Sequence, residues 1–356
     1  MQPIMEYQID MKRRFFHTAA LVALLLLLPT VAVAYDFEAD GIYYNLVDGH
    51  AVVTGSGQDE CYSGDVVVPA WVSHDDVTYL VTAIGHSAFK NCTSLTHVVL
   101  PGSITEIGPR VFEGCSALAS MVIPDAVTTM GANVFDRCYA IDTIVIGNKV
   151  TSLGNYMFND CRSLKSVTIG KSVASIGKYA FNGCSSLTDV VLPNAVATIG
   201  EWAFMDCSQL RNVTLGCALT FIDTHIFYHC NQLINLTCLA ATPPTVDYGL
   251  FDNSSMYQHA RLHVLPEAVD DYEAAEIWKY FFMIIGDATI PVPEDVNGDG
   301  ETNIADANTV IVIIINGGNQ GHTRPDGLPI DADVNGDGEV NIGDINAVIN
   351  FILSNH

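Results

Sequence analysis

A repeat of 23 residues constrains this chain more than any other feature. The stretch "VTAIGHSAFKNCTSLTHVVLPGS" begins at Val81, and "VASIGKYAFNGCSSLTDVVLPNA" begins at Val173 in the same register. A phenylalanine column recurs without a shift in seven units: Phe89, Phe112, Phe135, Phe158, Phe181, Phe204 and Phe227. Two aliphatic columns, which begin at Ile84 and Leu95, recur with it. A unit this short cannot bury its own apolar face, so the units must stack and share one core.

Each unit combines a strand pattern with a turn pattern. After Leu95 the side chains alternate, with Val98 and Leu100 directed inward and His97 and Val99 directed outward, which is strand behaviour. The "AFKNC" stretch has small and aromatic residues at near-helical spacing, and it predicts a short helical turn that closes the coil. The sequence therefore predicts an α/β-type repeat solenoid.

The repeat pattern I-G-x-x-A-F-x-x-C-x-x-L-x-x-V-x-L/I-P resembles the leucine-rich repeats of BspA-type bacterial surface proteins. On this resemblance, residues 81–241 are seven leucine-rich repeats, 35–80 form an N-terminal β cap, and 242–290 form a terminal repeat with a C-terminal cap. Caps are expected because an uncapped solenoid exposes apolar core and strand edges at both ends. The resemblance also implies that the solenoid binds a host matrix protein or another cell-surface protein.

The N-terminus has the pattern of an export signal. Lys12, Arg13 and Arg14 precede the apolar stretch "TAALVALLLLLP", and small residues at 32–34 offer a cleavage site. The apolar stretch is too short for a comfortable membrane span. We therefore expect residues 1–34 to be a signal peptide, and the mature protein to be extracellular and associated with the cell surface.

Charge excludes one class of partner. The net charge of −25 comes from 40 acidic and 15 basic residues. Such a surface repels phosphate backbones and anionic lipid headgroups, so we do not expect nucleic-acid binding.

Seven of the ten cysteines also form a column: Cys92, Cys115, Cys138, Cys161, Cys184, Cys207 and Cys230. Export favours disulfides, but equivalent side chains of stacked coils point the same way, whereas a disulfide needs converging side chains. Each coil supplies one sulfur without a histidine column, which argues against a metal array. We expect a column of buried, unpaired thiols. The pairing of Cys61, Cys217 and Cys238 stays open.

Two calcium-loop patterns lie near the C-terminus, 38 residues apart: "DVNGDGETNIAD" and "DVNGDGEVNIGD". Each places oxygen-bearing residues at loop positions 1, 3, 5, 7, 9 and 12 and a glycine at position 6, as a calcium ion requires. The predicted Ca²⁺ ligands of the first loop are Asp295, Asn297, Asp299, Glu301, Asn303 and Asp306. Those of the second are Asp333, Asn335, Asp337, Glu339, Asn341 and Asp344. We predict two calcium sites.

The paired loops resemble a type I dockerin, which implies attachment to the cohesin domain of a partner protein. We assign this module to residues 291–356. The family often has Ser and Thr at loop positions 10 and 11 for that contact, whereas this chain has Ile304 and Ala305, then Ile342 and Gly343. The partner would then meet a more apolar surface, or the module packs within its own chain. Eleven acidic residues against Arg324 predict unfolding when calcium is removed.

Catalytic patterns are missing from the sequence. His225 and His229, and likewise His259 and His263, are four residues apart, but surface or packing roles are favoured over metal binding. The sequence contains no glycine-rich phosphate loop, nucleophile elbow or zinc-protease motif. We therefore expect neither an enzyme nor a bound organic cofactor.

The outward strand positions are the expected working face. One column reads His97, Ser120, Thr143, Ser166, Asp189, Asn212 and Asn235. The next reads Val99, Val122, Val145, Thr168, Val191, Thr214 and Thr237. Neither column contains an aromatic anchor, which suits either a broad, weak contact surface or a merely structural sheet. The favoured function is secreted cell-surface binding or adhesion, with the dockerin-like module as attachment. The alternative is a component of an extracellular polysaccharide-degrading assembly, delivered by cohesin binding.

Overall fold

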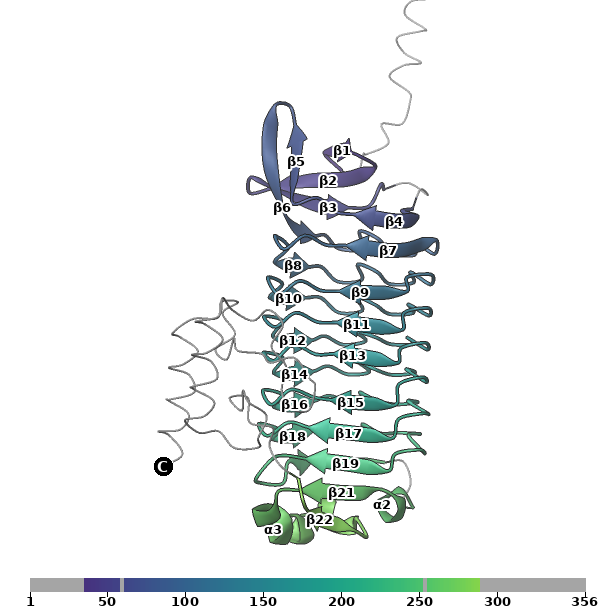
Figure 1. Cartoon of the computed structure of the whole chain (residues 1–356), viewed down its shortest axis with the longest axis vertical. Helices are drawn as coiled ribbons and strands as arrows, with labels where there is room; N and C mark the ends of the chain where they lie inside the picture. The colour runs from purple at the N-terminus through teal and green to yellow at the C-terminus, as the bar shows by residue number, and fades with distance from the viewer. Residues whose placement is uncertain (1–34, 58–60, 252–254, 289–356) are drawn as a thin grey trace, which may run out of the picture.

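The computed structural model describes residues 35–57, 61–251 and 255–288, which form one elongated stack of coils (Figure 1). The stack is a β-solenoid of about nine turns. The predicted repeat solenoid is therefore confirmed, and its period of 23 residues is the length of one coil.

Equivalent strands of successive coils stack in parallel into two ribbons. The first ribbon contains β4 (Gly64–Val67), β7 (Leu95–Val99), β9 (Ser120–Val122), β11 (Thr143–Val145), β13 (Ser166–Thr168), β15 (Asp189–Val191), β17 (Asn212–Leu215) and β19 (Asn235–Cys238). The second contains β8 (Glu106–Ile107), β10 (Thr129–Met130), β12 (Ser152–Leu153), β14 (Ser175–Ile176), β16 (Thr198–Ile199), β18 (Phe221–Ile222) and β20 (Thr245–Val246). Ile144 pairs with Met121 on one side and Val167 on the other, so equivalent residues lie in line.

The segment between the two ribbons, which was expected to be helical, consists of consecutive turns. Ser87 and Asn91 have φ angles of 57° and 60°, in the left-handed region that interrupts a right-handed helix. The Phe89 amide donates to the Val111 carbonyl of the next coil at 3.0 Å, instead of to a carbonyl four residues back in its own coil. The helical prediction for "AFKNC" was wrong because alternate amides, those of Phe89 and Asn91, donate to the neighbouring coil, while those of Lys90 and Cys92 donate three residues back as in turns.

The core is a set of residue columns inside the coils. The seven phenylalanines are fully buried, and adjacent rings are 5.0–5.8 Å apart between centroids. The inward prediction is confirmed for Val98 and Leu100, which are buried, while His97 and Val99 are exposed. Apolar burial of this kind is the main stabilising contribution in a repeat protein.

Two glycines show how closely the coils approach at the ends of the strands. A Cβ atom on Gly147 would lie 2.4 Å from the Pro124 carbonyl oxygen, and one on Gly170 would lie 2.1 Å from the Gly147 carbonyl oxygen. A side chain at either glycine would force the coils apart, because these contacts are with backbone atoms.

The N-terminal end is closed by strands that pair mainly in the antiparallel direction. These are β1 (Phe37–Ala39), β2 (Ile42–Val47), β3 (His50–Thr54), β5 (Trp71–His74) and β6 (Val77–Ile84). Strands β1, β2 and β3 form a meander, β5 and β6 form a hairpin, and β6 passes into the second ribbon by pairing with β8. The first coil is thereby covered.

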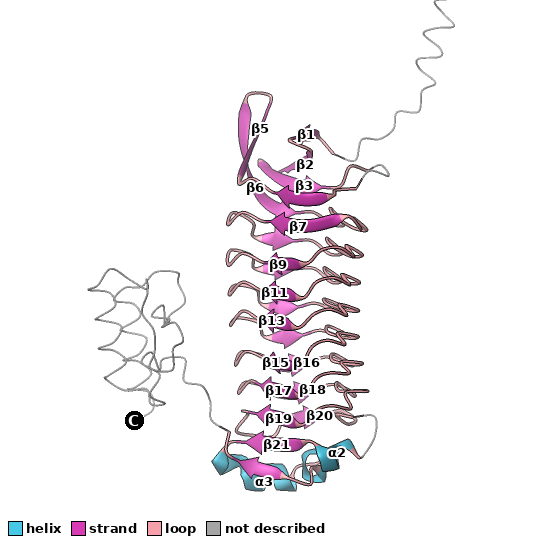
Figure 2. Cartoon of the chain, turned by 45° about the vertical axis from the view of Figure 1, so that its right-hand side comes forward, coloured by secondary structure: helices cyan, strands magenta, loops and turns pink. Residues whose placement is uncertain are grey.

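The C-terminal end is closed by short helices and the last two strands of the first ribbon (Figure 2). The elements are α2 (Met256–His259), β21 (Arg261–Val264), η1 (Pro266–Ala268), α3 (Val269–Ala274), η2 (Trp278–Tyr280) and β22 (Ile284–Gly286). Trp278 is fully buried, and its indole Nε1 donates to the Pro244 carbonyl at 2.8 Å. The Tyr272 hydroxyl donates to the Ala240 carbonyl at 2.9 Å. These bonds attach the cap to the last coils.

Candidate functional site

The outward side of the first ribbon, here called the strand face, carries the two columns that the sequence indicated. Its valines include strongly exposed members: Val99, Val122 and Val191 are 55 %, 63 % and 65 % exposed. Because β-branched side chains stand upright on a pleated sheet, this column forms a stripe of exposed side chains along the stack. The strand face therefore offers area and hydrogen-bonding groups, and no aromatic anchor.

The polar column of the strand face forms a hydrogen-bonded ladder in its C-terminal half. Asn212 donates to the Asp189 carboxylate at 2.6 Å, and Asn235 donates to the Asn212 side-chain oxygen at 2.7 Å. The Thr188 hydroxyl also donates to Asp189 at 2.6 Å. These donors, Thr188 first and Asn212 second, lower the pKa of Asp189 because they stabilise its ionised form. The ladder fixes the side chains in one arrangement.

At the N-terminal end of the same face, Asp65 on β4 joins the cap to the first repeat. Its carboxylate accepts the Thr96 hydroxyl at 2.6 Å and lies 2.9 Å from His97 Nδ1. The Thr96 hydrogen bond, and after it the His97 contact, lower the pKa of Asp65. His97, the first residue of the polar column, is thereby bound to the cap.

A different face carries the aromatic residues that the strand face lacks. The turns around Ser87 and Asn91, with their equivalents in later repeats, form what we call the turn face. Here an aromatic column at 23-residue spacing comprises Tyr156, Tyr179, Trp202, His225 and Tyr248. The Tyr156 and Tyr179 rings stack at 5.0 Å with 9° between their planes, and Trp202 lies 5.0 Å from Tyr179 at 43°. His225 meets Tyr248 edge-on at 5.7 Å.

This aromatic column was missed by sequence reasoning, although its signal was present. The sequence expectations concern buried columns and outward strand positions, and the turns enter them only as connections. Aligning the position of Ser87 through all the repeats would have shown four consecutive aromatic or imidazole side chains and a fifth at Tyr248. Exposed Trp and Tyr side chains are enriched where proteins bind other proteins, so the turn face is a second candidate surface.

A second polar ladder lies beneath the turn face. Asn159 donates to the Asp136 carboxylate at 2.7 Å, and Asn182 donates to the Asn159 side-chain oxygen at 2.7 Å. Asp136 is 7 % exposed. The Asn182 oxygen is buried and has no hydrogen-bond donor, because the next repeat has Met205 at this position. The ladder therefore ends with one unsatisfied acceptor.

Charged side chains gather on the turn face of the first repeats. Glu113 is 7 % exposed and accepts from Arg137 at 2.8 Å. Lys90 Nζ lies 3.2 Å from the same carboxylate, and Arg110 Nε lies 3.6 Å from it. A carboxylate at this depth is tolerated because three cations surround it.

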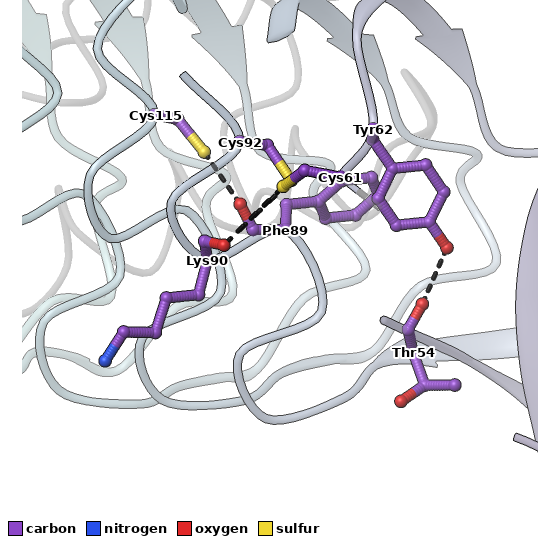
Figure 3. Close-up of a disulfide and its surroundings, with 7 residues drawn as sticks. All are labelled: Thr54, Cys61, Tyr62, Phe89, Lys90, Cys92 and Cys115. Atoms are coloured by element: carbon purple, nitrogen blue, oxygen red, sulfur yellow. Dashed lines mark hydrogen bonds between the residues drawn. A yellow bond between two sulfur atoms is a disulfide. The ribbon is translucent and has the colours of Figure 1, made fainter. Parts of the chain in front are cut away.

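The prediction of buried, unpaired thiols is confirmed for six members of the cysteine column and wrong for the first, Cys92. Cys92 forms a disulfide with Cys61, with a Cα–Cα distance of 5.2 Å (Figure 3). Cys92 can form this bond because Cys61 belongs to the N-terminal cap and is not the equivalent position of a stacked coil. Cys217 and Cys238, whose pairing was left open, are free thiols.

The remaining thiols of the column are buried and chemically quiet. Cys115 Sγ donates to the Phe89 carbonyl of the preceding coil at 3.0 Å, and the later members repeat this contact at 3.0–3.2 Å. Burial raises the pKa of Cys115 to about 12, so its reactive thiolate is scarce at neutral pH. Within the described ranges, no group of three or more His, Cys, Asp or Glu side chains can hold a metal ion.

The paired histidines do not converge. His225 and His229 have φ angles of 47° and 60° and belong to turns, not to one face of a helix. His229 contacts Asp206 at 2.8 Å, and His263 contacts Asp287 at 2.8 Å. His259 Nδ1 lies 2.7 Å from the Ser255 carbonyl. These separate partners agree with the packing and surface roles expected of them.

The twelve predicted calcium ligands, from Asp295 to Asp306 and from Asp333 to Asp344, lie outside the described residues. The basic and apolar segments of the predicted signal, at 12–29, lie outside them as well. Among the residues that are described, no helix is long and apolar enough to cross a membrane.

Comparison with known sequence families gives two matches. Residues 76–188 and 128–258 match the BspA type leucine rich repeat region, in six copies. Residues 293–353 match the dockerin type I domain. No curated protein matches the chain.

Solved structures of bacterial leucine-rich-repeat proteins are also similar. One from Bacteroides ovatus is 22 % identical and has a TM-score of 0.42, over 66 % of this chain and 81 % of its own. A leucine rich cell surface protein from Faecalibacterium prausnitzii is 20 % identical with a TM-score of 0.42, over 71 % and 95 %. A leucine rich repeat protein from T. pallidum is 21 % identical with a TM-score of 0.39, over 71 % and 99 %.

Proposed function

The chain belongs to the BspA-type leucine-rich-repeat family, and from this premise we propose that it is a secreted, non-enzymatic bacterial adhesion protein. Its solenoid recognises another protein, and its dockerin domain attaches it to a surface assembly. Both domains are protein-interaction modules of non-catalytic families. The proposal divides the chain into a signal peptide (1–34), an N-terminal cap (35–80), repeats (81–241), a C-terminal cap (242–290) and the dockerin module (291–356).

The observation that carries the proposal is the combination of a long exposed solenoid with a dockerin domain in one chain. A stacked solenoid offers an extended surface, because equivalent side chains are aligned over many coils. The coils leave the polar and β-branched columns of the strand face open to solvent. A broad surface of this kind suits contact with a large partner, such as a host matrix protein or a cell-surface protein.

Calcium is the expected structural ion of the attachment module, because type I dockerins bind calcium. We propose two sites, with Asp306 and Asp344 as the closing carboxylates of the two loops. Hard oxygen ligands at this spacing suit calcium, and the ion compensates a strongly acidic segment. Binding to the folded state alone would add about 2.7 kcal/mol per independent site at one hundred times the dissociation constant.

A second function is favoured by the dockerin match itself. Dockerins imply a cohesin-type partner, so the chain would be one component of an extracellular polysaccharide-degrading assembly. In that case the solenoid would act as a recognition or spacing element within the assembly. Ile304 and Ile342, which replace the usual polar residues of the contact, would give such an interface a more apolar character.

One experiment separates the two readings. The full chain is immobilised and exposed to purified extracellular-matrix proteins and to a recombinant cohesin domain, in calcium and in EGTA. Adhesion predicts matrix-protein binding that survives EGTA, because the solenoid has no calcium loop. Assembly predicts cohesin binding that disappears in EGTA.

A full-length Asp306→Ala, Asp344→Ala double variant is the matched control for calcium. It should behave in calcium as the wild type does in EGTA, with loss of the module's helical circular-dichroism signal. Unchanged cohesin binding or an unchanged signal in EGTA would contradict the structural role of calcium. Failure of every matrix protein to bind would contradict adhesion.

A further inference from the structure

Two columns of different chemistry run side by side on the turn face of the last repeats. The aromatic column contributes Trp202, His225 and Tyr248. The residues just before Trp202 and His225, which are Glu201 and Thr224, form a second, polar column. In the last coil Phe221 pairs with Thr245, so Asp247 is there the equivalent of Asp223. The Trp202 amide donates to the Thr224 carbonyl of the next coil at 3.1 Å, so the two columns stay in register.

The rings of the aromatic column are not equally available. Tyr156 and Tyr179 cover each other's faces, since their planes are 9° apart at a centroid distance of 5.0 Å. Trp202 is half-buried and tilted by 43°, and Tyr179 is the one ring that contacts it among the described residues. The stack is therefore interrupted between Trp202 and His225, and an indole face is left without an aromatic neighbour.

The backbone does not require aromatic side chains at these positions. Tyr179 and Trp202 have φ angles of 54° and 53°, in the left-handed region that is unfavourable for bulky residues. The equivalent turns of earlier repeats have the same conformation with Ser87 and Asn133, whose φ angles are 57° and 60°. The large rings are therefore held in a strained backbone that Ser87, Arg110 and Asn133 occupy in the earlier repeats.

Carboxylates lie in the same turn as the half-buried indole and in the turns of the next coils. Lys178 Nζ lies 3.1 Å from Glu201 Oε2, and this hydrogen bond raises the pKa of Lys178. The charge of Asp223 also raises it. Asp223 Oδ1 accepts the Thr224 amide at 2.7 Å, and Asp247 Oδ2 accepts the Thr224 hydroxyl at 3.4 Å. Glu201 and Asp223 thus act on one lysine, and Asp247 is joined to the turn of Asp223 through Thr224.

We propose that Trp202, together with Glu201, Asp223 and Asp247, binds an arginine side chain of a basic segment in a partner protein. A planar guanidinium can stack on the indole face while its N–H groups donate to the carboxylates, as an ammonium group cannot do equally well. The net charge of −25 attracts such a segment from a distance. This assignment rests on the proposed protein-recognition function, and it locates the recognition on the turn face.

The test uses the full chain in saturating calcium and a fluorescent arginine-rich peptide, with its lysine and citrulline counterparts. Binding is measured by anisotropy at low and at physiological salt. The wild type should prefer arginine over lysine, and it should not bind the citrulline peptide. Trp202→Asn should weaken arginine binding by about tenfold or more. Asparagine is accommodated in the same turn at Asn133, and an unchanged melting temperature will show that the variant is folded.

Two matched variants remove equal charge from different places. Glu201→Gln with Asp247→Asn should weaken arginine binding strongly, whereas Glu106→Gln with Glu273→Gln, both exposed and outside the turn face, should not. Equal losses in the two double variants would show a general charge effect and overturn the assignment. So would unaltered binding by Trp202→Asn, or wild-type binding of a neutral cello-oligosaccharide in place of the arginine peptide.

The outcome also separates this assignment from the proposed function. If a purified matrix protein binds the full chain and Trp202→Asn leaves that binding intact, protein recognition stands and the turn-face site is wrong. If neither a matrix protein nor a basic peptide binds the wild type, both are wrong.

Discussion

The strand face and the turn face are built from the same repeat, yet they differ in what they present to solvent. The strand face displays separate upright side chains, among which Val122 and Val191 are 63 % and 65 % exposed. The turn face stacks the rings of Tyr156 and Tyr179 at 5.0 Å and leaves Trp202 partly uncovered. Regular sheet geometry therefore yields a broad, uniform surface, and the irregular turns provide the selective chemistry.

The two faces also differ in how deeply their polar ladders lie. The strand-face ladder through Asn212 is exposed, whereas the turn-face ladder through Asn159 is partly buried and begins at the buried Asp136. Hydrogen bonds to buried acceptors contribute more to stability, because their loss leaves an acceptor that water cannot reach. The turn face should therefore be the more sensitive of the two to polar substitution.

The largest expected effect on the free energy of unfolding lies at the N-terminal end, where each face is joined to the cap differently. Backbone pairing of β4 with β7 joins the strand face, and the Cys61–Cys92 disulfide joins the turn face. Cys61→Ala should lower the free energy of unfolding by about 2–4 kcal/mol, because the unfolded chain regains the freedom of a long loop. Urea denaturation monitored by circular dichroism measures this loss.

A reductant provides the control for the disulfide. Dithiothreitol should reduce the stability of the wild type to that of Cys61→Ala and leave the variant unchanged, because the other eight described cysteines are free thiols. A wild type that is as stable in dithiothreitol as without it would show that strand pairing alone holds the cap.

Substitutions in the two polar ladders should have an intermediate effect on the free energy of unfolding. Asn159→Ala should lower the free energy of unfolding by about 1–3 kcal/mol, since it leaves Asp136 without its amide donor. Asn212→Ala, on the strand face, should have an effect below about 1 kcal/mol because water replaces the lost bond. Equal losses would remove the distinction between the faces.

The same ladder offers a gain of stability. Met205→Asn would place an amide beside the unsatisfied Asn182 oxygen, and we expect an increase of about 1 kcal/mol in the free energy of unfolding. Met205→Leu is the matched control, because it keeps an apolar side chain and adds no donor. If both variants have the same stability, the Asn182 oxygen is already satisfied by water.

The smallest effect is a pH dependence on the strand face. The folded-state pKa of Asp189 is lowered from its ordinary value of 3.8, so this residue contributes stability above pH 3.8. That contribution disappears as the pH falls through the lowered pKa. Because the group is largely exposed, the change should stay below about 1 kcal/mol. Asp189→Asn should reduce the pH dependence of the urea unfolding midpoint between pH 5 and pH 2, while Ser120→Ala should leave that dependence unchanged.

Much of the fold could be predicted because a stacked solenoid repeats one environment. The position of Phe89 or Leu95 in the repeat determines its burial in every coil, and strand alternation separates Val98 from Val99. The turns could not be predicted in the same way. Alternate amides of the turns donate to neighbouring coils, and the near-helical spacing of "AFKNC" gives no sign of the left-handed conformation at Asn91.

The candidate sites were predicted less completely, for two physical reasons. Cys61 pairs with Cys92 through an approach of the cap that no repeat position encodes. The aromatic column is visible in the sequence, but ring stacking depends on turn geometry. The alternation of the strands therefore gives no indication of a site at Trp202. The calcium ligands between Asp295 and Asp344 stay a prediction, because they follow from loop spacing alone.

The register of the coils has a consequence for how such a chain changes over generations. Because Gly170 and Gly147 meet backbone to backbone and the buried phenylalanine column continues from one coil to the next, a whole 23-residue unit can be duplicated or lost without disturbing either cap. Each duplication would lengthen the reach of the molecule by about 4.8 Å. A copy of the unit around Trp202 would also add an aromatic side chain to the column. The same duplication would then extend both the molecule and its proposed binding surface.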